Sequence, residues 1–505
     1  MIPGLVAESA SARLWRGLEH ALDRPGGAGV NPLRHCGALA VLMLGLLLVS
    51  GVWLYAVFDT SASGAYASIA RLGDRPHAPG GMMRSLHRYA TDAFLLFTFL
   101  HLLREALLGR WRHFRRYTWL TGVVLLPFAA TAAIGGFWLN WDALGQFSAL
   151  ATAEWLDALP LFAQPLSRNF LVDAAVSDRL FSLFVFVHIG ASLLLLFGLW
   201  FHLQRLTRAT LLPPRALACG MLAALVALAW VAPVLSQAQA ALAHAPAAVV
   251  LDWVALFVHP LMYATSPAFA WALVLGGLAL LAGLPWWPGA PAPTIARVAA
   301  AHCNGCRRCF ADCPYAAITM APHPDRRRGR ELAVVDAALC AGCGICAGAC
   351  PSASPFQRAA HVTSGIDVPG EEIDALRARL DDALAAHGGA APLAVFACAR
   401  AVDTRALSGR GALVLPLACA GQLPPSFVAY ALRAGAAQVL VTSCRDAGCT
   451  FRLGARWTRE RLAGTREPHL RAGVRRARVL LLQAERGEEY LLDEVHFARA
   501  EGRHG

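Results

Sequence analysis

Two pairs of histidines are spaced identically in apolar stretches of the chain. His87 and His101 are 14 residues apart, and His188 and His202 repeat that spacing. At about 100° per residue, 14 residues make close to four helical turns, so both rings of a pair leave one helix face about 21 Å apart. Two such helices facing each other would pair His87 with His188 and His101 with His202, which predicts two stacked bis-histidine haem sites. Histidines that are merely hydrogen-bonded inside a bundle are the alternative, although ionisable residues within membranes are rare and usually functional.

The neighbourhood of the histidines offers further haem-binding residues. Arg84 and Arg104 flank the first histidine pair and could bind haem propionates, or could anchor the helix ends. Four glycines repeat the 14-residue period and would let a flat macrocycle approach the backbone: Gly37, Gly51, Gly122 and Gly136.

A second chemical signal is the motif C-x2-C-x2-C-x3-C-P, which occurs twice after residue 300. In the two-cluster bacterial ferredoxin run, the fourth cysteine of each motif ligates the other cluster. The motifs therefore predict two [4Fe–4S] clusters, one on Cys303, Cys306, Cys309 and Cys350 and one on Cys340, Cys343, Cys346 and Cys313. Zinc is the alternative, but zinc sites rarely use this doubled run with trailing prolines.

A third group of cysteines follows short apolar runs near the C-terminus. Cys398, Cys419 and Cys444 end three runs that alternate with helical segments, and Cys449 lies in the next loop. This alternation predicts a parallel α/β sheet, and ligands gather beyond the carboxyl ends of such strands. Four converging thiolates would suit a [2Fe–2S] cluster, with a metal-free set of buried or redox cysteines as the alternative.

These residues need a membrane part and a soluble part to position them. The chain has 505 residues, 57% of them hydrophobic, and a mean hydropathy of +0.47. Six apolar stretches are long enough to span a bilayer: 36–57, 85–107, 117–138, 180–203, 216–232 and 268–285. The first of these is preceded by a predicted interfacial helix rather than a secretory signal.

The fold class is therefore multi-domain. We expect an all-α transmembrane four-helix haem bundle with two further spans, then a small α+β ferredoxin domain and an α/β parallel-sheet domain. The expected boundaries are 1–34 for the interfacial helix, 35–210 for the di-haem bundle, 211–285 for the two further spans, 286–295 for a proline-rich linker, 296–365 for the ferredoxin domain and 366–505 for the last domain.

Charge and cysteine distribution predict the orientation. Arginines cluster after spans two and four, and such positive loops stay cytoplasmic. An even number of spans then returns the iron–sulfur domains to the reducing cytoplasmic side of the inner membrane, where ligation is favoured over disulfides. Cys36 and Cys219 lie in apolar spans and are expected to be inert. The net charge of +12 follows mostly from this bias and from a basic soluble half. No platform of aromatic and basic residues accompanies it, so we expect contact with membrane lipid and no nucleic-acid partner.

The first part of the chain resembles the cytochrome b family of quinol-oxidising bc and b6f complexes. The resemblance rests on PHAPGGMMRSLHR, the four histidines, the four glycines and GFWLNWDALGQFSA. It implies an outer haem on His87 and His188, an inner haem on His101 and His202, and quinone sites near each membrane face. Family members are dimers, which by analogy predicts a homodimer.

A later stretch departs from this family. The family has a Pro-Glu-Trp-Tyr loop whose glutamate accepts a quinol proton, whereas this chain has LDWVALFVHPLMYATSP, with Asp252 and Trp253 in place of Glu-Trp. Asp252 is therefore a candidate proton acceptor, with a helix cap as the alternative.

The last domain resembles the delta subunit of methyl-viologen-reducing hydrogenase. The matching stretches are VFAC, LACAGQLPPSFVAYALRAGAAQVLVTSCRDAGCTFRLG and LLQAERGEEYLLDEV, although Ala401 stands where the family usually has a second cysteine. The resemblance implies electron exchange between a hydrogenase or formate dehydrogenase and a flavin-bearing heterodisulfide reductase-like subunit.

The combined pattern predicts a membrane protein that links the quinone/quinol pool, through two b haems and iron–sulfur clusters, to a cytoplasmic flavin- or metal-containing redox enzyme. The chain would then act as a quinone/quinol oxidoreductase subunit. The alternative is a non-catalytic membrane anchor and electron conduit without quinone turnover of its own.

Overall fold

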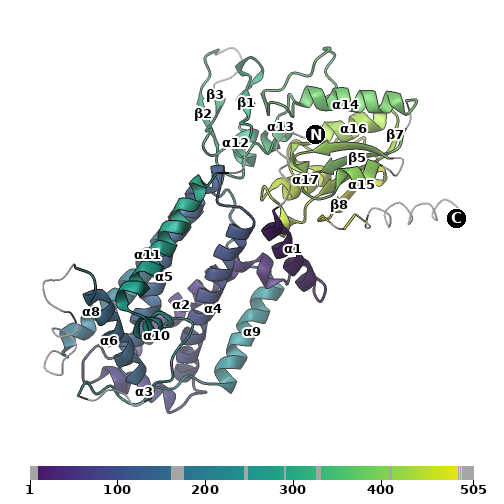
Figure 1. The fold of residues 1–505 in the computed structure, drawn as a ribbon. Helices are drawn as coiled ribbons and strands as arrows, with labels where there is room; N and C mark the ends of the chain where they lie inside the picture. The colour runs from purple at the N-terminus through teal and green to yellow at the C-terminus, as the bar shows by residue number, and fades with distance from the viewer. Residues whose placement is uncertain are drawn as a thin grey trace, which may run out of the picture. The chain divides into compact units, whose positions relative to one another are not determined.

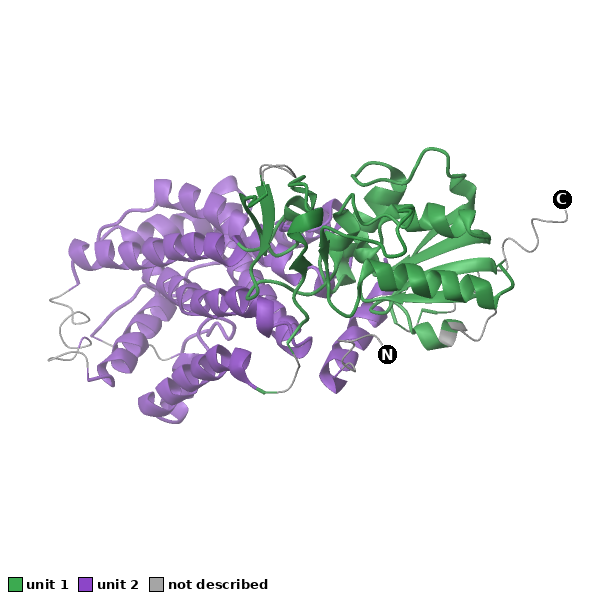
Figure 2. Cartoon of the chain, turned by 90° about the horizontal axis from the view of Figure 1, so that it is seen from above, with its two compact units in different colours: residues 1–8, 205–208, 288–505 green, residues 9–204, 209–287 purple. Residues whose placement is uncertain are grey.

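A computed structural model describes residues 9–160, 166, 176–243, 248–288, 292–325, 331–389, 391–408, 412–486, 488–489 and 491. The chain divides into two compact units, coloured separately in Figure 2. One contains residues 9–204 and 209–287 and is called the membrane unit here. The other contains residues 205–208 and 288–505 and is called the soluble unit.

The membrane unit is helical wherever its elements are described (Figure 1). Its helices are α1 (Ala10–Asp23), α2 (Cys36–Val57), α3 (Ala65–Gly73), α4 (Pro79–Leu107), α5 (Arg116–Asn140), α6 (Ala143–Asp157), α8 (Asp178–Leu203), α9 (Arg215–Val231), α10 (Val258–Ala264) and α11 (Pro267–Gly283). Helix α2 packs along α4, and α5 packs along α8. Leu39 and Met43 on α2, Phe94 and Phe97 on α4 and Leu195 on α8 belong to one buried apolar cluster, which is the core of the predicted four-helix bundle.

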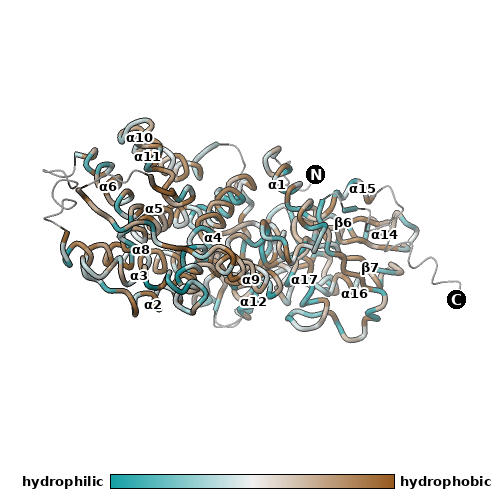
Figure 3. The backbone as a smooth tube through the Cα atoms, turned by 90° about the horizontal axis from the view of Figure 1, so that it is seen from below, coloured by the Kyte–Doolittle hydropathy of each residue, from teal (hydrophilic) through white to brown (hydrophobic). Residues whose placement is uncertain are grey.

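Four helical segments are long and apolar enough to cross a membrane: Cys36–Val57, His113–Asn140, Asp178–Leu203 and Pro267–Trp286. Figure 3 shows hydrophobic residues running along them. The sequence predicts six spans, and the other two differ for separate reasons. Helix α4 is 29 residues long but carries histidines and charged residues, which lower its hydropathy. Helix α9 is apolar but has only 17 residues, at the short end of what a bilayer requires.

The first part of the soluble unit consists of short paired strands around the cysteine motifs. Strand β1 (Arg297–Val298) pairs antiparallel with β4 (Ile366–Asp367), and β2 (Ile318–Pro322) pairs antiparallel with β3 (Glu331–Val335). Two five-residue helices, α12 (Arg308–Asp312) and α13 (Ile345–Ala349), each follow the first cysteines of a motif. This is the small α+β arrangement that the doubled motif predicts.

The second part of the soluble unit is a four-stranded parallel sheet in the order β6-β5-β7-β8. Its strands are β5 (Ala391–Cys398), β6 (Leu413–Leu417), β7 (Ala436–Ser443) and β8 (Val479–Gln483), and its helices are α14 (Ile373–Ala386), α15 (Thr404–Ser408), α16 (Pro425–Arg433) and α17 (Gly454–Ala463). Parallel pairing places the carboxyl ends of β5, β6 and β7 at one edge. The predicted α/β class is therefore confirmed.

Candidate functional site

The four histidines meet in the two pairs that their spacing predicts. The ring centroids of His87 on α4 and His188 on α8 are 6.3 Å apart, and those of His101 and His202 are 6.4 Å apart. Two metal–imidazole bonds of about 2 Å, extended by the radii of two rings, require about this separation. The residues therefore fit an iron held between two imidazoles at each level.

Hydrogen bonds on the outer ring nitrogens support the same arrangement. A metal-binding histidine usually has its second nitrogen fixed by a neighbouring oxygen, which sets the ring orientation. Three of the Nδ1 atoms have such a neighbour: Ser50 Oγ lies 2.9 Å from His87, Ala132 O lies 2.8 Å from His188, and Thr121 Oγ1 lies 3.3 Å from His202. The Nε2 atoms of these rings remain available for iron.

The four glycines have a role that the sequence does not reveal. A Cβ added at any of them would come within 3.0–3.2 Å of an imidazole Cε1. On α2, Gly37 lies against His101 and Gly51 against His87; on α5, Gly122 lies against His202 and Gly136 against His188. The glycines therefore make room for the rings themselves, and each level has one glycine behind each histidine.

The two candidate propionate-binding arginines are in different surroundings. Buried Arg84 donates to neutral acceptors, the carbonyl of Ile69 at 3.2 Å and the hydroxyl of Ser236 at 2.8 Å. Its guanidinium also interacts electrostatically with the carboxylate of Asp142. Arg104 instead donates to Glu19 Oε1 at 2.7 Å and to Glu105 Oε1 at 3.1 Å.

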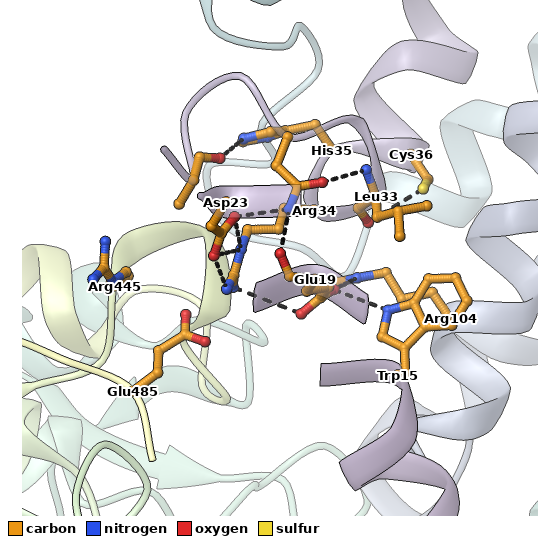
Figure 4. A network of polar contacts seen from close by, with 12 residues as sticks. Trp15, Glu19, Asp23, Leu33, Arg34, His35, Cys36, Arg104, Arg445 and Glu485 are labelled. Carbon is orange, nitrogen blue, oxygen red and sulfur yellow. Dashed lines mark hydrogen bonds and ion pairs between the residues drawn. The ribbon is translucent and has the colours of Figure 1, made fainter. Parts of the chain in front are cut away.

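Glu19 is the centre of a buried network that ties α1 to α4 (Figure 4). It also accepts from Trp15 Nε1 at 2.9 Å and lies 3.6 Å from Arg34, which in turn pairs with Asp23. These contacts favour the anchoring alternative for Arg104.

The carboxylate of Asp252 caps a turn rather than a helix, because the next helix, α10, begins only at Val258. Its Oδ1 accepts the backbone N–H groups of Val254 at 2.9 Å and Ala255 at 2.7 Å, and its Oδ2 pairs with Arg88. Both oxygens are thus engaged, so the geometry favours a turn-capping role over the proton acceptor.

His259, seven residues later, is a buried polar residue that belongs to none of the sequence motifs. Its Nε2 lies 2.9 Å from Thr152 Oγ1, its ring meets Phe147 edge-on, and its Nδ1 has no hydrogen-bond partner among the described residues. The sequence signal that could have revealed His259 is a histidine within the apolar run VALFVHPLMY.

The cysteines of the doubled motif line two separate cavities, and each cavity contains one predicted ligand set. Cys303, Cys306, Cys309 and Cys350 line a cavity of about 330 Å³, and Cys313, Cys340, Cys343 and Cys346 line one of about 360 Å³. Backbone N–H groups point at two of the sulfurs, from Ala317 to Cys313 at 3.3 Å and from Ala296 to Cys340 at 3.5 Å. Burial raises the pKa of the Cys343 and Cys346 thiols, because it disfavours the charged thiolate form.

The third cavity, of about 200 Å³, is lined by Cys398, Cys419, Cys444 and Cys449. The Sγ atoms of Cys398 and Cys444 are 4.0 Å apart, and the hydrogen bond between them lowers the pKa of Cys398 to about 6. Within the described residues, no three His, Cys, Asp or Glu side chains are gathered as a single metal ion requires.

Comparison with known proteins agrees with this division of the chain. Residues 23–209 match the family cytochrome b/b6/petB, residues 302–354 match the 4Fe-4S dicluster domain, and residues 396–496 match the delta subunit of methyl-viologen-reducing hydrogenase. All three predicted resemblances are confirmed. With its four apolar helices, the chain is a multi-pass membrane protein that combines a cytochrome b-like part with iron–sulfur domains.

Two individual proteins show the extent of the similarity. The chain is 28% identical over 170 residues to cytochrome b of Allochromatium vinosum, a match that covers 34% of this chain and 41% of that relative. It thus spans less than half of the curated relative. A structure of a hyperthermophilic respiratory complex III aligns with a TM-score of 0.40 and 18% identity, covering 50% of this chain and 74% of the other.

Proposed function

We propose that this protein transfers electrons between the membrane quinone/quinol pool and a cytoplasmic redox enzyme. The observation that carries the proposal is the presence, in one chain, of two histidine pairs with iron-binding separation and three cavities lined by four cysteines each. Membrane and soluble redox sites in one chain are useful only if electrons pass between them.

The chain's own residues set where each redox group would be held. His87 with His188 and His101 with His202 would bind two b haems, which supply one-electron transfer across the membrane. The doubled motif would bind two [4Fe–4S] clusters, and Cys398, Cys419, Cys444 and Cys449 would bind a [2Fe–2S] cluster. Arg84, buried with neutral hydrogen-bond partners, would pair a haem propionate.

The resemblance of the last domain supports the class of soluble partner. A hydrogenase, a formate dehydrogenase or a flavin-containing heterodisulfide reductase-like enzyme would exchange electrons with the third cysteine site. Anaerobic purification of the full chain from native membranes, followed by mass spectrometry of co-eluting proteins, tests this. Co-elution of such an enzyme supports the proposal. A chain that elutes alone and reacts only with a diffusible carrier contradicts the stable partner.

The contacts of Asp252 favour a second candidate, a conduit without quinone turnover. Because both oxygens of this carboxylate are engaged, it is poorly placed to accept a quinol proton. Addition of quinol to the purified protein separates the candidates: reduction of the haem absorbance, with a spectral shift on adding a quinone-site inhibitor, supports the quinone enzyme. Unchanged haem spectra support the conduit.

A further inference from the structure

Two of the three cysteine sites are connected by a tight backbone contact within the soluble unit. Gly344 follows Cys343 directly and has a φ of +71°, and a Cβ there would lie 2.7 Å from the Gln422 side chain. Gly421 lies two residues after Cys419, and a Cβ there would lie 2.8 Å from Ile345. The segments that carry Cys343 and Cys419 therefore touch through residues adjacent to the cysteines themselves.

Glycines on both sides make this approach possible. A Cβ at Gly348 on α13 would collide with the carbonyl oxygen of Gly421, and one at Gly454, which begins α17, would collide with the Cys419 sulfur. On the other side of the contact, Gln422 is held by the hydrogen bond from its Nε2 to the Glu371 carbonyl at 2.6 Å. The contact is close-packed and contains little room for movement.

Arg461 on α17 bridges the contact from within. Its side chain is 1% exposed and donates to the Gly421 carbonyl at 2.8 Å and to Asp312 Oδ2 at 2.5 Å. Arg461 therefore holds Gly421, two residues after Cys419, to Asp312, the residue before Cys313. Trp457, one turn earlier, donates to the Asp312 carbonyl at 3.1 Å. This contact, called the joint here, links the second cysteine site, which contains Cys313 and Cys343, to the third, which contains Cys419.

The joint also contains a buried positive charge, that of Arg461. Asp312 is shared between Arg461 and Arg466, and Arg466 also lies 3.4 Å from Glu460, whereas Arg461 is the buried guanidinium beside Gly421. The Nε of Arg461 has no hydrogen-bond partner among the described residues. A positive charge in a buried setting stabilises the more negative, reduced form of a neighbouring redox centre.

We propose that the cysteine sites around Cys343 and Cys419 are consecutive stations on one electron path, and that Arg461 positions them and favours the reduced state of the centres beside it. This rests on the proposed function, because it requires clusters at both sites. Each step moves one electron, so that one centre is oxidised as the other is reduced, and no proton moves. The path runs between the quinone pool at one end and the soluble redox enzyme at the other.

Electron paramagnetic resonance on the anaerobically purified full-length protein tests the path. When both centres are reduced, we expect their signals to broaden through mutual magnetic interaction. Iron content and the separate signals first establish that both clusters are present. Two clusters without interaction would overturn this inference alone, whereas a missing third cluster would overturn the proposed [2Fe–2S] site and this inference with it.

Redox titration of Arg461→Gln tests the role of the arginine. We expect about a tenfold loss of electron affinity at an adjacent centre, which is ~59 mV for a one-electron couple. The potential of the centre on Cys303, Cys306, Cys309 and Cys350 should stay unchanged. Arg461→Lys should stay near the wild-type potential because it keeps the charge. Arg459→Gln is the matched control, since Arg459 lies on the same helix but pairs with Asp446 at the exposed surface. Unchanged reduction potentials in Arg461→Gln, with all clusters present, would show that Arg461 has only a structural role. If this variant does not fold, Arg461→Lys and the wild-type magnetic interaction still test the joint.

Discussion

At the scale of single residues, the histidine rings and the glycines behind them form matched sets. Each level of the bundle contains two imidazoles about 6 Å apart, and each imidazole lies against a residue without a side chain. The glycines are therefore as specific to the site as the histidines, because any larger residue would move a ring away from its partner.

The glycine contacts predict a selective loss of one haem. Gly51→Val should displace His87 and reduce the haem content from two per chain towards one, because even its Cβ would lie 3.2 Å from the ring. Gly45→Val on the same helix is the control, since a Cβ at Gly45 has nothing within 4 Å. Haem content is measured by the pyridine haemochrome spectrum. Two haems in Gly51→Val would show that the glycine is not required for ligation.

We expect substitution of Asp252 to have a mild effect on quinol-driven haem reduction, whereas loss of a proton acceptor would have a severe effect. Asp252→Asn keeps an oxygen that can accept from Val254 and Ala255 and loses only the ion pair with Arg88. We expect quinol-driven haem reduction to fall less than about tenfold, which is 1.4 kcal/mol in barrier. Stopped-flow absorbance measures it. A loss of hundredfold or more with intact haem spectra would restore Asp252 as the proton acceptor.

At the scale of elements, apolar length and motif spacing predict much of the architecture. The haem helices, the doubled cysteine motif and the parallel sheet follow from patterns within single segments. Contacts between segments do not: the pairing of Arg104 with Glu19, the position of His259 against Thr152 and the joint at Arg461 each join residues from separate elements. Such contacts depend on packing, which a single sequence does not specify.

From the network around Glu19 we infer that buried ion pairs hold α1 against α4. Glu19→Gln would leave Arg104 and Arg34 without a shared carboxylate, and removing one partner of a buried ion pair costs about 3–5 kcal/mol. We expect a lower unfolding temperature and faster proteolysis near α1. Leu14→Gln, at an exposed position of the same helix, is the control and should change little. Equal protease resistance in both variants would argue against charge-based docking.

At the scale of the whole molecule, the arginine-rich loops and the reducing-side cysteines predict one orientation. The soluble unit should lie on the cytoplasmic side of the inner membrane. Protease added to inverted vesicles should digest residues 288–505, whereas right-side-out vesicles should protect them, as an immunoblot of the C-terminal part would show. Digestion in right-side-out vesicles would reverse the assigned topology.

The central claim is that electrons pass along this one chain between its cysteine sites and its haems. The most direct test mixes the full-length protein with a reduced viologen in a stopped-flow instrument and follows haem absorbance, comparing wild type with a Cys343→Ser/Cys346→Ser variant that retains both haems. We predict that haem reduction is at least about tenfold slower in the variant, because the second cysteine site, formed by Cys313, Cys340, Cys343 and Cys346, is lost. Equal rates would show that the haems are reduced without the iron–sulfur sites and would contradict the account.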